Sequence, residues 1–119
     1  MPRDLKDARS ARLSADWQFG ISYNAALKLC TILLYAEGYR PEKSLAHYRT
    51  LQSISLILGP NHQEDADYLD TCRIKRNTAE YDLAGQISAE EADELLAFVS
   101  EFRESVIHWL KTRHPNLLS

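Results

Sequence analysis

The sequence predicts an all-α fold, an up-and-down bundle of four to five antiparallel helices. No segment shows an alternation of apolar and polar residues that would indicate a strand, and apolar residues recur at helical spacing along several stretches. The chain has only four Gly and four Pro, and most of them stand where those stretches stop. Because the connections are short, neighbouring helices are expected to be antiparallel.

The N-terminal half contains a short segment and then the most apolar helix of the chain. Leu5–Leu13 is charged and weakly amphipathic. Ser14 is suited to cap a long helix that runs to about Glu37, with Gly38 as the residue after its end. This helix is apolar around most of its circumference, except for a narrow polar stripe of Asn24, Lys28 and Thr31. Such a helix must be central or must bury its second side against another subunit, so we expect a homodimer.

Two further helices are predicted in the middle of the chain. Pro41 suits the first turn of the third helix, which continues through Leu58 and ends at Gly59-Pro60. Asn61 is then expected to cap a fourth helix that runs to about Asp82.

The last helix has the clearest start signal in the sequence. After a break at Ala84-Gly85, Ser88 and Glu91 form a capping box. The fifth helix is predicted to continue to about Thr112, and Pro115 prevents a longer one. Its apolar face is expected to comprise Ala92, Leu95, Leu96, Val99, Phe102, Val106, Trp109 and Leu110.

Length and composition indicate one domain over residues 1–119. Hydrophobic residues make up 45% and charged residues 26%, as in globular proteins. The net charge of −3 argues against a general nucleic-acid coat protein, although a small basic site is compatible with it. Cys30 and Cys72 lie in apolar helical patterns, which is typical of buried thiols in a reducing compartment. We found no signal-peptide pattern and no apolar run long enough to cross a bilayer, so the sequence predicts a cytoplasmic protein without a membrane segment.

The predicted fourth helix gathers polar side chains within a sector of roughly 140°, taking about 100° per residue. These residues are Asp70, Arg73, Arg76, Asn77, Glu80 and Tyr81. Two arginines, an amide and a phenol on one side of a helix could hold a phosphate and perform limited proton chemistry. The ordinary alternative is a solvated helix face with an Arg76–Glu80 pair, and chemistry alone favours that alternative.

Other polar residues add possible contacts but no metal site. Asn24 could bond across the bundle to Arg73, Asn77 or Tyr81, and Arg40 at a turn could reach a phosphate. None of the four histidines has spaced His, Cys or carboxylate partners, so neither a metal nor another cofactor is predicted. Asn24 and Arg40 are also compatible with a purely structural role. The histidines are His47, His62, His108 and His114.

Several short motifs, in their order and spacing, resemble small stand-alone bacterial HEPN-domain proteins. The motifs are Tyr23-Asn24-Ala25-Ala26, Gly38-Tyr39-Arg40, His47 and the run Arg73-x-x-Arg76-Asn77-x-x-x-Tyr81-Asp82. The resemblance covers nearly the whole chain. It implies an all-α bundle that dimerises and, in many members, metal-independent RNA cleavage or a toxin–antitoxin pairing with a nucleotidyltransferase.

One position departs from the pattern of the ribonuclease members. Arg76 and Asn77 match the family's arginine and polar residue, but Tyr81 stands where the active members have a histidine. Histidine exchanges protons near neutral pH, whereas an unperturbed tyrosine keeps its proton to about pH 10. The departure therefore argues against efficient RNA cleavage.

Three functions are compatible with these residues. The first is a homodimeric module of a toxin–antitoxin or stress-defence system that binds nucleotide or RNA with little or no catalysis. Its binding residues would be Arg73, Arg76, Asn77, Tyr81, Asn24 and Arg40. The second is a ribonuclease toxin that uses Arg76 and Tyr81 as catalytic residues. The third is a purely structural dimeric scaffold.

Overall fold

The computed structural model describes residues 5–39, 46–81 and 87–117, with side chains for 15–39, 49–77 and 87–117. The described chain forms an all-α bundle, which confirms the predicted fold class. Its helices are α1 (Leu5–Ala36), α2 (Ala46–Leu58), α3 (Gln63–Tyr81) and α4 (Ala89–Arg113). Two short 3-10 turns, Pro60–His62 and Pro115–Leu117, precede α3 and follow α4.

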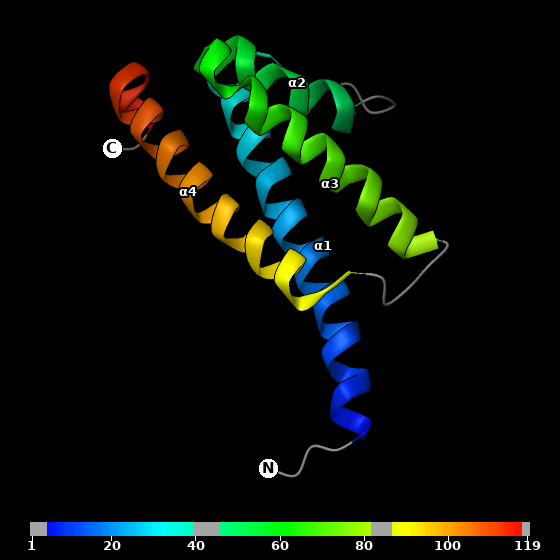
Figure 1. Ribbon diagram of the computed structural model, residues 1–119. Coiled ribbons are helices and arrows are strands. Elements are labelled where there is room, and N and C mark those ends of the chain that lie inside the picture. Colours follow the sequence, from blue (N-terminus) through cyan, green and yellow to red (C-terminus); the bar gives the residue numbers. More distant parts are fainter. Residues whose placement is uncertain (1–4, 40–45, 82–86, 118–119) are drawn as a thin grey trace.

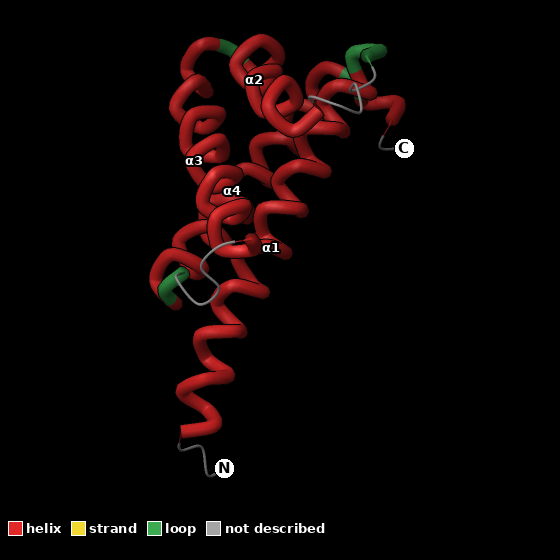
Figure 2. Tube along the Cα trace, turned by 90° about the vertical axis from the view of Figure 1, so that its right-hand side faces the viewer, coloured by secondary structure: helices red, strands yellow, loops and turns green. Residues whose placement is uncertain are grey.

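The long helix α1 is the centre of the bundle and contacts all three other helices. Figure 1 shows α3 running antiparallel to both α1 and α4. Figure 2 shows that the N-terminal turns of α1 extend beyond the other helices. The core around α1 contains the aromatic pair Phe19 and Tyr23 together with Leu33 from this helix, and Leu51, Ile54, Leu69, Leu95 and Val106 from the others.

Two helix ends have the predicted local structure. Gly38 adopts a positive φ of 88°, and its N–H donates to the carbonyl of Tyr35 while that of Tyr39 donates to Leu34. This pair of bonds is a Schellman motif, which requires a residue that tolerates the left-handed conformation. At the start of α4, the Ser88 hydroxyl accepts from the N–H of Glu91, whose carboxylate accepts from the Ser88 N–H. Both predicted caps are confirmed.

Three expected details of the helices are wrong. A single helix continues through Ser14, because no residue there prevents the next turn from forming. A serine acts as an N-terminal cap only where a helix begins. Asn61 lies inside the 3-10 turn, so α3 begins at Gln63 without an Asn61 cap. Leu96 is 53% exposed, because α4 packs a narrower face than the apolar pattern suggested. The expected features at Pro41 and Ala84-Gly85 lie outside the described residues.

The segment Ala15–Ala36 of α1 is long and apolar enough to cross a membrane, judged by length and composition alone. The expectation that no apolar run reaches that length is therefore wrong. A central bundle helix has the same composition, because it must supply core contacts to several neighbours. About a third of the segment is buried by the other helices, and its exposed side carries both apolar and polar residues.

A polar contact joins α3 to α4 beside the core. The half-buried Tyr68 hydroxyl lies close to the Cys72 thiol and the Glu94 carboxylate, while its ring packs 4.7 Å from that of Phe98. Burial, together with these neighbours, raises the pKa of Tyr68 above its usual range. Near the ends of the two helices, Lys75 forms an ion pair with Glu91. These contacts fix the position of α3, and hence of its arginines, relative to α4.

The two buried thiols predict alkaline destabilisation of the fold. Burial raises the pKa of Cys30 to about 12 and that of Cys72 to about 11, from an ordinary value of 9.0. The thiols of the unfolded chain therefore lose their protons at lower pH than those of the folded chain. As a result, the free energy of unfolding keeps its full value below the unfolded pKa and falls as pH rises through the folded pKa. We expect the free energy of unfolding in urea to fall by about 1 kcal/mol per thiol at about pH 10.

Substitution of both cysteines by alanine provides the control for this prediction. The double variant is expected to be less stable at neutral pH, because two core groups are smaller, but to show a flatter decline up to about pH 10. Equal slopes for wild type and variant over that range would show that the thiols do not cause the decline.

Candidate functional site

The predicted polar sector of α3 begins on the same side of the helix as its buried apolar residues. Ala66 and Leu69 are fully buried, and Arg73 and Arg76 follow them at the spacing that keeps residues on one helix face. The inner face of α3 therefore changes from apolar to cationic along its length. Both arginines are half-buried, so the interpretation of this sector as a wholly solvated face is wrong.

Arg76 packs against the central helix. Its guanidinium carbon lies 5.5 Å from the ring centroid of Tyr23, within the range of a cation–π contact. Gly20, one turn earlier on α1, is also next to this side chain, because a Cβ at Gly20 would lie 3.8 Å from the Arg76 Nε, an ordinary van der Waals distance. The contact holds the guanidinium beside the buried ring of the central helix.

Arg73 is held by a neighbour on its own helix. Its Nε donates to Asp70 Oδ1 at 2.9 Å, and both side chains are about a quarter exposed. A half-buried guanidinium needs such a partner because transfer out of water is costly for a charge. We call the group formed by Gly20, Tyr23, Asp70, Arg73 and Arg76 the α1–α3 seam.

The seam contains a tyrosine that keeps its proton. Burial raises the pKa of Tyr23 to about 12, and this effect outweighs the opposing influence of Arg73 and Arg76. At neutral pH the phenol is therefore neutral and cannot act as a general base. The seam thus supplies positive charge and fixed hydrogen-bond donors, which suit binding of an anion better than proton transfer.

The other predicted site residues are not all part of the seam. Asn77 is exposed one turn beyond Arg73. Asn24 is exposed on α1, and no hydrogen bond joins it to Arg73 or Asn77, so that part of the predicted cross-bundle bonding is wrong. Tyr81 is the last residue of α3, and its side chain lies outside the described set, as does the whole of Arg40.

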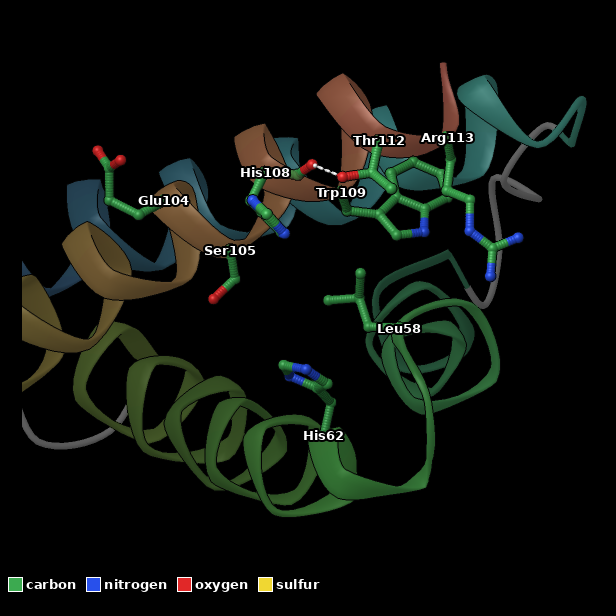
Figure 3. A pocket seen from close by; sticks show the side chains of 8 residues that line it. All are labelled: Leu58, His62, Glu104, Ser105, His108, Trp109, Thr112 and Arg113. Carbon is green, nitrogen blue, oxygen red and sulfur yellow. Dashed lines mark hydrogen bonds between the residues drawn. The ribbon is translucent and has the colours of Figure 1, made fainter. Parts of the chain in front are cut away.

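A second group of polar residues, which the sequence interpretation did not connect, lies at the opposite end of α3. A groove of about 440 Å³ separates the start of α3 from the last turns of α4. His62 and His108 line it from opposite sides (Figure 3). The sequence contained one signal for it, since Ser105, His108 and Thr112 share one face of the last helix. The facing histidine is 46 positions earlier, so only the tertiary fold brings the two together.

Among the described residues, no three His, Cys, Asp or Glu side chains cluster closely enough to hold a metal ion. No family model, curated protein or solved structure matches the chain.

Proposed function

We propose that this protein is a HEPN-like homodimeric module that binds nucleotide or RNA with little or no catalysis. The observation that carries the proposal is the cationic inner face of α3. Arg76 and Arg73 occupy positions that would ordinarily hold core residues, and each has a partner that orients it. A pre-oriented arginine loses less conformational entropy when it binds a phosphate, so such a pair is favourable for recognising a phosphodiester.

The outer side of α1 supports the proposed dimer. Four large apolar side chains are exposed there, namely Trp17, Ile21, Ile32 and Tyr35. Together with the exposed Asn24 and Lys28 they fall within a sector of about 80°, so they form one continuous stripe, the outer α1 face. Large exposed apolar side chains on one helix face, here in two groups on either side of Asn24 and Lys28, are typical of an interaction surface. Gly20 borders the stripe, so a dimer through this face would bring two copies of the seam near the interface.

The family resemblance extends this proposal to a cellular role. It suggests a component of a toxin–antitoxin or stress-defence system in the cytoplasm, with a nucleotidyltransferase as a candidate partner protein. The high pKa of Tyr23 and the tyrosine at position 81 both favour binding over cleavage. In this proposal Asn77, which is exposed beside the arginines, provides an amide contact to the ligand.

A purely structural scaffold is the second candidate, and one observation favours it. The Arg76–Tyr23 contact also holds α3 in place against α1, and the Asp70–Arg73 ion pair stabilises α3 itself. If these contacts are the whole role of the arginines, their removal will weaken the fold or the dimer and leave no ligand-dependent defect. The two candidates therefore differ in a measurable way.

Arg76→Ala is expected to weaken binding of a fluorescein-labelled single-stranded RNA by roughly tenfold to a hundredfold, measured by anisotropy without added metal. The range corresponds to the loss of one hydrogen bond to a charged group. Arg103→Ala is the matched control, because it removes the same charge from an exposed position on α4. Size-exclusion chromatography with light scattering would be run on each variant.

The outcomes separate the candidates. Loss of RNA binding by a folded dimeric Arg76→Ala protein supports the proposed function. Loss of the dimer, with no RNA binding by the wild type, supports the scaffold. RNA cleavage by the wild type that disappears in both Arg76→Ala and Tyr81→Phe would instead establish the ribonuclease alternative.

A further inference from the structure

The groove at the upper end of the bundle has the composition of a small-molecule site. It lies where the corner between α2 and α3 faces the C-terminal turns of α4 (Figure 3). Its volume of about 440 Å³ is within the range of ordinary ligand pockets. It is separated from the α1–α3 seam, because His62 and Arg76 are about 20 Å apart along α3.

His62 is held in a fixed orientation at one wall of the groove. Its Nδ1 lies 2.8 Å from Asp65 Oδ2, one turn further along the chain. Because a carboxylate only accepts, Nδ1 carries the proton of this bond. The ring projects into the groove, with Nε2 as its second polar atom (Figure 3). A histidine oriented by a carboxylate in this way is pre-organised for contact with a ligand.

The opposite wall is one face of α4. Ser105 and His108 point into the groove towards His62 (Figure 3). The Thr112 hydroxyl donates to the carbonyl of His108 at 2.9 Å and so remains an acceptor on the same face. The two walls together present two imidazoles and hydroxyl groups to whatever occupies the groove.

The charge of the lining favours an anion. Arg113 lines one end of the groove, in addition to the two histidines. The one carboxylate of the lining, Glu104, points away from the groove in Figure 3 and forms a 3.4 Å ion pair with Arg103. A cationic guanidinium is a usual partner of a phosphate group, and an imidazole binds one by donating a ring N–H. Because the Nδ1–H of His62 is used on Asp65, His62 donates to a phosphate in the groove when Nε2 carries a proton as well.

The remaining lining residues are a leucine and a tryptophan, which has a planar ring. Leu58 extends into the groove from the end of α2, and the half-buried Trp109 lines it from α4. The Trp109 ring is braced on another side by His114, whose ring lies 5.0 Å away. His114 is in turn fixed by a 2.8 Å contact to Glu37 at the end of α1. An indole held in this way offers a surface against which a flat ring can pack.

We propose that this groove binds a small phosphate monoester with a planar body, of the size of a nucleoside monophosphate. His62, His108 and Arg113 hold the phosphate, Ser105 adds a hydroxyl contact, and Leu58 with Trp109 receives the planar part. The inference is independent of the function proposed for the seam, because it uses none of the same side chains.

The test is isothermal titration calorimetry of the full chain with three probes, AMP, adenosine and inorganic phosphate. AMP is expected to bind at least about tenfold more tightly than either fragment, since both parts of the groove contribute. His62→Gln and His108→Gln are each expected to weaken AMP binding by about tenfold or more, the loss expected for one hydrogen bond to a charged group. Lys111→Gln, which removes an exposed cation of α4 outside the lining, should have little effect.

Each contrary outcome overturns the proposal. Absence of AMP binding by the wild type would show that the groove is not such a site. Inorganic phosphate that binds as tightly as AMP would show that the groove is an adventitious ion site only. AMP binding that survives both groove substitutions but is lost in Arg76→Ala would place the ligand at the seam instead. Circular dichroism of each variant verifies that these surface substitutions leave the fold intact.

Discussion

Ile21→Asp is expected to convert the protein from a dimer to a monomer at micromolar concentration, as measured by light scattering. Ile21 is 56% exposed on the outer α1 face, next to Trp17, which is 73% exposed. If this face forms the proposed dimer, the substitution places a charge in an apolar contact on both subunits. An uncompensated buried charge costs roughly 3–5 kcal/mol, which corresponds to more than about a hundredfold in Kd.

Leu96→Asp is the matched control for this prediction. Leu96 is 53% exposed on α4, so the substitution makes the same change of chemistry at the same degree of exposure. It should leave the oligomeric state unchanged. A wild-type protein that is already monomeric, or a Leu96→Asp variant that alone dissociates, would contradict the assignment of the dimer interface to the outer α1 face.

The parts of the fold that could be predicted depend on nearby residues. The cap at Ser88 requires Glu91 three positions later, and the end of α1 requires a residue at position 38 that accepts a positive φ. Both signals are complete within a few residues of sequence. The predicted boundary at Ser14 was wrong because nearby residues alone do not decide it. A residue that is able to cap a helix caps it only if the preceding turn does not form, and that is decided by the stability of the longer helix.

The site could be predicted only in part, for a related reason. Helical spacing placed Arg73 and Arg76 on a shared face, but it could not decide whether that face turns outward or towards another helix. Their surroundings include Gly20 and Tyr23, which are fifty or more positions away in the sequence. The same limit applies to the groove, where His62 and His108 face each other only because the fold places the start of α3 opposite the last turns of α4 (Figure 3).

Tyr23→Ala is expected to lower the free energy of unfolding by about 3–5 kcal/mol, the usual cost of removing a large aromatic side chain from a core. Tyr23 is fully buried on the central helix, so the cavity would lie between α1 and α3. The substitution also removes the ring on which Arg76 rests. RNA binding should therefore weaken in any fraction that remains folded, because the guanidinium loses its fixed orientation. Urea unfolding followed by circular dichroism measures the stability.

Tyr23→Phe and a double-mutant cycle separate packing from the cation–π contact. Tyr23→Phe keeps the ring and removes only the hydroxyl, so it should cost much less than Tyr23→Ala, at most about 1.5 kcal/mol. In a cycle of Tyr23→Leu with Arg76→Ala, we expect a coupling free energy of about 0.5–1 kcal/mol. A coupling near zero would mean that Arg76 gains nothing from the ring. Tyr23 would then have no part in orienting Arg76 for the proposed phosphate contact.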